Sequence, residues 1–171
     1  MSLSPKVLEA LTQQINRELY SSYLYAAMTS YCETQNFKGF ANWLTIQAQE
    51  EREHAQKLID HLHDRGCQVR FDAIAAPPHE FESMVDVFSQ ALSHETQLAE
   101  DINKIYDLAV TERDYPAQIL LQWFVTEQVE EVSITSEMLE NIRMVGENSQ
   151  GMFLLDRDAA GRSDTDGDGE G

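Results

Sequence analysis

The stretch Gln49-Glu50-Glu51-Arg52-Glu53-His54 places a carboxylate and an imidazole on a helical face that is otherwise apolar. In a helix, Glu51 and His54 lie three residues apart and project from the same side. A carboxylate in a helix core is costly unless it is paired or binds a metal ion. We therefore expect partners at the same level of neighbouring helices. The apolar residues that recur at three- and four-residue steps on this side are Phe37, Phe40, Leu44, Ala48, Ala55, Leu58 and Leu62.

The composition is that of one acidic globular domain. The chain has 171 residues, of which 42% are hydrophobic, enough for a sizeable core. Twelve Lys and Arg against thirty Asp and Glu leave a formal charge of -18, which disfavours nucleic acid and anionic membranes and favours cations as partners. Cys32 and Cys67 form no CxxC motif, and no apolar run approaches the length of a membrane span. We expect a cytoplasmic protein with reduced thiols.

Five segments of the chain have the period of amphipathic helices. Ser4 and Pro5 are a typical helix start, and Gly66 a typical helix end. Four of the predicted helices are long, with about 30 residues each, and the fifth, near the C-terminus, is short. The predicted ranges are about 5–33, 37–65, 81–112, 115–145 and 149–159.

The connection between the second and third helices is long. Residues 67–80 lack a helical period and contain Pro77-Pro78, and Val69, Phe71 and Ile74 alternate as in a short strand. Such a link can carry the chain from one end of a bundle to the other. The sequence therefore predicts an all-α, up-down-down-up four-helix bundle over residues 4–160, followed by an acidic, Asp/Gly-rich tail over residues 161–171.

Polar residues interrupt all four apolar stripes at one level. Glu18 and Glu51 are 33 residues apart, as are Glu95 and Gln128, and each pair has a helix turn near its midpoint. Residues equidistant from the turn of an antiparallel hairpin lie level with each other. Gln128, which is neutral, is expected to hydrogen-bond to a metal ligand. The six polar residues predicted to meet in mid-bundle are Glu18, Glu51, His54, Glu95, Gln128 and Glu131.

One imidazole with several carboxylates, and no thiolate, suits iron or manganese better than structural zinc. A carboxylate between two ions can bridge them at about 3.5–4 Å, and Glu51, beside His54, is the expected bridge. Glu18 and His54 would then complete the coordination of the first ion. Glu95 and Glu131 would complete the second.

Four segments of this chain resemble the ferritin family, specifically the non-haem ferritins of prokaryotic type. The resemblance spans about residues 4–158 and implies a ferritin-like bundle with the long crossover between its second and third helices. The matching segments are Asn16-Arg17-Glu18-Leu19-Tyr20-Ser21-Ser22-Tyr23-Leu24-Tyr25, Glu50-Glu51-Arg52-Glu53-His54-Ala55, His94-Glu95 and Gln122-Trp123-Phe124-Val125-Thr126-Glu127-Gln128-Val129-Glu130-Glu131.

The resemblance also implies a ferroxidase centre. Tyr25 matches a tyrosine that lies beside the centre in this family. The implied ligands are Glu18, Glu51 and His54 for the first iron, Glu51, Glu95 and Glu131 for the second, and Glu50, Glu127 and Glu130, with Glu131 shared, for a third iron site.

The implied activity is oxidation of Fe²⁺ by O₂ or hydrogen peroxide, with storage of Fe³⁺ in the cavity of a hollow 24-mer. Haem is not expected, because Arg52 stands where bacterioferritins carry a haem-binding methionine. Gln118 and Leu121 correspond to carboxylates that line the threefold pores of animal ferritins. Two alternatives remain: a non-storing di-iron oxidase or peroxidase of rubrerythrin-like type, and a structural bundle whose carboxylates form an ion network.

Overall fold

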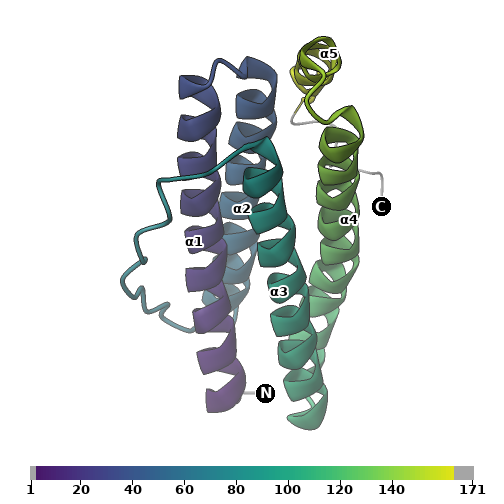
Figure 1. Ribbon diagram of the computed structural model, residues 1–171. Helices are drawn as coiled ribbons and strands as arrows, with labels where there is room; N and C mark the ends of the chain where they lie inside the picture. Colours follow the sequence, from purple (N-terminus) through teal and green to yellow (C-terminus); the bar gives the residue numbers. More distant parts are fainter. Residues whose placement is uncertain (1–2, 164–171) are drawn as a thin grey trace.

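The computed structural model describes residues 3–163, so most of the predicted acidic tail, residues 164–171, lies outside the described residues. Within them the chain is helical, with no strand. Four long helices are followed by a short one, as the sequence predicts (Figure 1). The helices are α1 (Pro5–Thr34), α2 (Lys38–Asp64), α3 (Met84–Thr111), α4 (Tyr115–Val145) and α5 (Ser149–Ala159).

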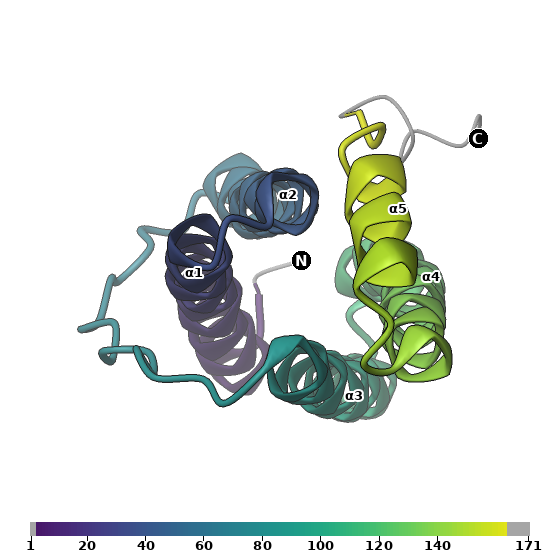
Figure 2. The ribbon, with the colours of Figure 1, turned by 45° about the horizontal axis from the view of Figure 1, so that its top comes forward.

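The four long helices form an up-down-down-up bundle. In Figure 1, α1 and α4 run upward, whereas α2 and α3 run downward. The connection from α2 to α3 passes outside α1 and returns the chain to the top of the bundle (Figures 1 and 2). The predicted crossover is therefore confirmed, and α5 packs across the upper end against α2 and α4.

The crossover forms no strand among the described residues, although Val69, Phe71 and Ile74 alternate as in a short strand. Val69 is buried, but Phe71 and Ile74 are 62% and 41% exposed, and the segment stays extended without pairing. A strand needs a neighbour to complete its hydrogen bonds. Here the Asn16 side chain instead donates to the carbonyl groups of residues 72 and 73, which ties the crossover to α1.

The third helix begins three residues later than predicted. Ser83 caps α3, because its side chain accepts a hydrogen bond of 3.1 Å from the backbone N–H of Asp86. Phe81 continues the apolar pattern and packs against the ring of Tyr31, but it precedes the cap. Apolar periodicity alone therefore placed the helix start too early.

The core consists of two apolar blocks, one toward each end of the bundle. Phe40 and Phe88 are fully buried in the upper block, and Leu11 and Phe124 in the lower one. Between the blocks lies the layer of buried polar side chains that the hairpin spacing predicts. No helix of the described residues is both long and apolar enough to span a membrane.

Gln118 and Leu121, which correspond to the pore carboxylates of animal ferritins, differ in burial. Leu121 is fully buried in the lower apolar block, so its side chain cannot line a channel. Gln118 is half-buried, and its side-chain amide donates to the carbonyl group of Ala109.

Candidate metal centre

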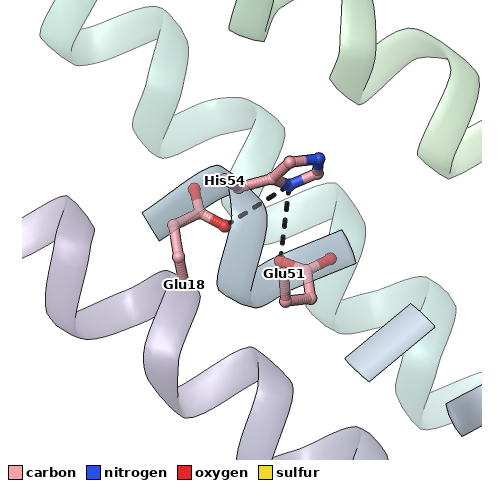
Figure 3. Close-up of side chains that lie close together, drawn as sticks. All are labelled: Glu18, Glu51 and His54. Atoms are coloured by element: carbon pink, nitrogen blue, oxygen red, sulfur yellow. Dashed lines mark ion pairs between the residues drawn. The ribbon is translucent and has the colours of Figure 1, made fainter. Parts of the chain in front are cut away.

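Glu18 of α1 and Glu51 and His54 of α2 converge in the middle of the bundle (Figure 3). His54 Nδ1 lies 3.9 Å from Glu18 Oε2 and 3.7 Å from Glu51 Oε2. All three side chains are buried. The i, i+3 spacing within α2 and the hairpin register between α1 and α2 together produce this triad.

The other nitrogen of His54 faces α4. His54 Nε2 lies 3.6 Å from Oε1 of Glu127, and these two side chains form a second potential metal-binding group with Glu131. Glu131 also accepts a hydrogen bond from the side-chain amide of Gln47, one turn before Glu51 on α2. His54 therefore links the two groups.

Glu95 of α3 is level with Gln128 of α4, as the matched spacing predicts. The Gln128 side chain donates to Oε2 of Glu95 at 3.1 Å, and the Tyr25 hydroxyl donates to Oε1. Both carboxylate oxygens of Glu95 thus have hydrogen-bond partners from other helices. Tyr25 lies beside the polar layer, where the resemblance places it, and is fully buried.

The second group differs from the expected second set of ligands. We expected Glu51, Glu95 and Glu131 to gather together, but among the described residues Glu95 belongs to neither group. Its carboxylate is turned toward Tyr25 and Gln128. Glu127, which was expected only at the third site, approaches His54 instead.

Several buried polar atoms in this layer have no hydrogen-bond partner among the described residues. They include Oε2 of Glu18, both carboxylate oxygens of Glu51, Nδ1 of His54 and Oε1 of Gln128. Buried oxygen atoms without partners are rare, and such a group requires an explanation. A bound cation would satisfy them together, since every one is an oxygen or an imidazole nitrogen, the atoms that bind iron.

The pKa values of the carboxylates reflect their crowding in a dry interior. Burial, followed by the charge of Glu95, raises the pKa of Glu51 well above its ordinary value. Burial is also the main cause that raises the pKa of Glu95 to about 7 and that of Glu131 to about 8. These carboxylates therefore retain protons near neutral pH unless a cation replaces them.

Burial shifts the pKa of the His54 imidazole in the opposite direction to that of the carboxylates. Burial alone would lower its pKa, but the carboxylates of Glu127 and Glu51, with the charge of Glu18, outweigh burial and raise the pKa well above the ordinary value. Metal binding needs a neutral imidazole. A metal ion would thus displace the proton from His54 as well as those from the carboxylates.

The predicted third-site residues lie at the edge of this layer. Glu50, Glu127 and Glu130 line a pocket between α2 and α4 together with Glu131. Glu50 and Glu127 are half-buried, and Glu130 is exposed. Arg162, which follows α5, lines the same pocket and bonds to Glu50 at 2.7 Å.

Sequence reasoning missed three side chains that contact the centre. Gln14 donates to Oε1 of Glu18 at 2.7 Å, and its i, i+4 spacing on α1 was the available signal. Gln47 offers the same i, i+4 signal relative to Glu51, whereas Arg162 acts from beyond α5, so no local spacing indicates it. Of the remaining histidines, His94 is half-buried with Nε2 2.6 Å from Ser21 Oγ, and burial lowers its pKa to about 4.

A bundle of this topology, with carboxylates and a histidine buried at its centre, is the architecture of ferritin-like proteins. A family model described as "Ferritin-like domain" matches residues 8–145. The chain therefore belongs to the ferritin family, and its function is of the ferritin type, the handling of iron.

Individual relatives narrow the class to non-haem ferritins. A "Probable bacterial non-heme ferritin-like protein" of Haemophilus influenzae is 38% identical over 156 residues, covering 91% of this chain and 94% of the relative. A "Bacterial non-heme ferritin" of Staphylococcus aureus is 34% identical over 161 residues, covering 94% and 97%. An open pore ferritin from the archaeon Archaeoglobus fulgidus has a TM-score of 0.93 and 38% identity, covering 94% and 98%.

Proposed function

We propose that this protein is an iron-storage ferritin that oxidises Fe²⁺ at the mid-bundle site and deposits Fe³⁺ mineral inside a 24-subunit shell. The observation that carries the proposal is the set of buried, unpartnered carboxylate oxygens around His54. Membership of the ferritin family and the acidic charge of -18 support it.

In this proposal the two iron ions share Glu51. Glu18 and His54 complete the coordination of the first ion, and Glu95 and Glu131 complete that of the second. Glu51 suits the bridging role, because both of its oxygens lack hydrogen-bond partners within residues 3–163. Glu95 would rotate from Tyr25 and Gln128 to reach the second ion, while these two side chains hold its carboxylate nearby beforehand.

The chemistry is a two-electron transfer. Each of two Fe²⁺ ions gives one electron to O₂, which takes up two protons and leaves as hydrogen peroxide. With hydrogen peroxide as the oxidant, the same two electrons and two protons give two molecules of water. The dry apolar blocks above and below the site limit the access of other molecules to the iron pair.

A groove between α2 and α4 offers Fe²⁺ a route to the site. Its walls are mainly polar, and it leads past Asp60, Glu53 and Glu127 to His54. Carboxylates along such a groove attract cations. We propose Glu50, Glu127 and Glu130 as ligands of a third iron site beside the pair, and the cytoplasm as the place of action.

Rapid-mixing measurements of Fe²⁺ oxidation test the assigned site. Glu51→Ala and His54→Ala are expected to slow the fast phase by at least about 100-fold, because each removes a ligand of the first ion. Glu100→Ala is the control, since Glu100 is exposed on α3. Unchanged fast oxidation in both site variants would rule out this site.

The main alternative is a di-iron oxidase or peroxidase of rubrerythrin-like type that stores nothing. Such proteins usually carry a CxxC-bearing electron-transfer module, whereas Cys32 and Cys67 here are distant in sequence and both free. Particle mass separates the two functions. A particle of about 24 subunits that retains hundreds of iron ions supports storage, and a stable dimer that retains about two ions per chain would favour the alternative.

A further inference from the structure

Arg162 places a positive charge directly on a proposed ligand of the third iron site. Its Nη2 atom lies 2.7 Å from Glu50 Oε2, and its Nη1 atom lies 2.9 Å from Gln47 Oε1. The guanidinium also stacks over the ring of Trp43, with 4.5 Å from Cζ to the ring centroid. The Arg162 and Glu50 side chains are only 13% and 18% exposed, so solvent screens this pair less than a surface pair.

The docking of α5 onto α2 fixes the position of Arg162. Asp156 of α5 accepts a hydrogen bond of 2.9 Å from the backbone N–H of Phe40, in the first turn of α2. Gly39 permits this approach, because a Cβ atom there would lie 1.5 Å from the carbonyl oxygen of Asp156. Beyond α5, the Asn42 side chain donates to the carbonyl oxygen of Arg162 at 3.2 Å.

The guanidinium reaches both metal environments. Through Glu50 it occupies one corner of the pocket that Glu127, Glu130 and Glu131 also line. Through Gln47, whose amide donates to Glu131, it connects with a proposed ligand of the second ion. Arginine keeps its charge at every accessible pH, so this cation cannot be neutralised by loss of a proton.

We propose that Arg162 is a resident cation that weakens the third iron site and sets its affinity relative to the pair. An ion in the pocket must either displace Arg162 from Glu50 or bind beside a fixed positive charge, and both reduce its affinity. Arg162 is thus a positioning residue that keeps the third site transient while Gln47 orients Glu131. This inference rests on the proposed function, because it presupposes the iron pair and the third site.

Titration calorimetry with Zn²⁺, which is not oxidised, tests the proposal without relying on activity. The intact protein is expected to bind two ions per chain strongly and a third weakly. Arg162→Gln removes the charge but retains much of the side-chain length. This variant is expected to bind the third ion at least tenfold more tightly. Arg162→Lys retains a cation and is expected to keep the third ion weak. Arg157→Gln is the matched control, because Arg157 is exposed on α5 and pairs with its neighbour Asp158.

A second substitution shows where the third ion with increased affinity binds. Adding Glu50→Gln to Arg162→Gln is expected to abolish the gain, and thermal unfolding checks that each variant is folded. If Arg162→Gln binds two ions strongly but binds the third no more tightly than the intact protein does, the proposed role of Arg162 is overturned and the proposed function is not. Absence of the two strong ions from the intact protein would contradict the proposed function and, with it, this inference.

Discussion

The Tyr25 hydroxyl donates a hydrogen bond to Oε1 of Glu95, across the buried centre of the bundle. Tyr25 belongs to α1 and Glu95 to α3, so the contact joins the two helix hairpins at the level of the metal site. Burial, followed by the charge of Glu95, raises the pKa of Tyr25 well above its ordinary value. The tyrosine is therefore a neutral donor that holds the Glu95 carboxylate in the metal-free protein.

Tyr25→Phe is expected to destabilise the metal-free protein by about 1–3 kcal/mol, because it leaves a buried carboxylate oxygen without its donor. The loss is expected to shrink in the metal-loaded protein, where an ion takes the place of the donor. Thermal unfolding with and without Zn²⁺ measures both effects. Tyr23→Phe is the control, since Tyr23 is 53% exposed. Equal losses of stability in Tyr25→Phe and Tyr23→Phe would contradict the role assigned to Tyr25.

The stability of the metal-free protein is expected to fall as the pH rises from about 7 to about 8.5. Burial raises the pKa of Glu131 to about 8 from an unfolded value near 4.5, and the pKa values of Glu51 and His54 are also raised. The folded state therefore holds more protons than the unfolded state in this window, and stability falls as they are lost. Each such group contributes on the order of 1 kcal/mol, or a few degrees in the unfolding temperature.

Groups whose pKa values are lowered do not change the expected fall in stability between about pH 7 and 8.5. Burial lowers the pKa of His94 to about 4, so its contribution changes between about pH 4 and 6.5 and is constant above that range. Differential scanning fluorimetry at several pH values measures the slope. Saturating Zn²⁺ is expected to abolish it, because bound carboxylates are already ionised. An unfolding temperature that rises with pH in the metal-free protein would refute the prediction.

Gly39→Ala is expected to release α5 from α2. The added Cβ would meet the carbonyl oxygen of Asp156 at 1.5 Å, and a backbone atom cannot move aside without displacing its helix. Elsewhere in a helix the same change stabilises by about 1 kcal/mol. Limited proteolysis is expected to cut near residues 146–162 much faster in the variant. An equally resistant, more stable variant would show that α5 is not held by this contact.

Trp123 is expected to report on occupation of the centre. Its ring lies 5.4 Å from that of His54, and the Lys57 ammonium sits 4.2 Å from its centroid. Binding of Co²⁺, which quenches nearby fluorophores, is expected to reduce the emission over the first two ions. Trp123→Phe is expected to remove most of this response and Trp43→Phe to retain it. A response that depends mainly on Trp43 would place the first ions elsewhere.

The level of the site could be predicted from sequence because long helices behave as rods. With about 1.5 Å of rise per residue, equal distances from a turn bring residues to equal height. The hydrogen bond between Gln128 and Glu95 and the approach of Glu18 to His54 confirm this register. The family resemblance then supplied the chemistry that spacing alone leaves open.

The details that the sequence did not indicate depend on packing between distant segments. Arg162 reaches Glu50 only because Gly39 and Asp156 dock α5 onto α2, and helical periodicity carries no information about that docking. The strand-like alternation that ends at Ile74 likewise forms no strand, because alternation cannot supply the partner strand that pairing requires.

The central claim is that two iron ions share Glu51 in mid-bundle. Anomalous X-ray diffraction at the iron edge, from crystals soaked with Fe²⁺ without oxygen, tests it most directly. The account predicts two strong peaks in each chain, about 3.5–4 Å apart, on either side of the Glu51 carboxylate and next to His54. Iron peaks confined to the exposed carboxylates, with none beside Glu51 and His54, would contradict it.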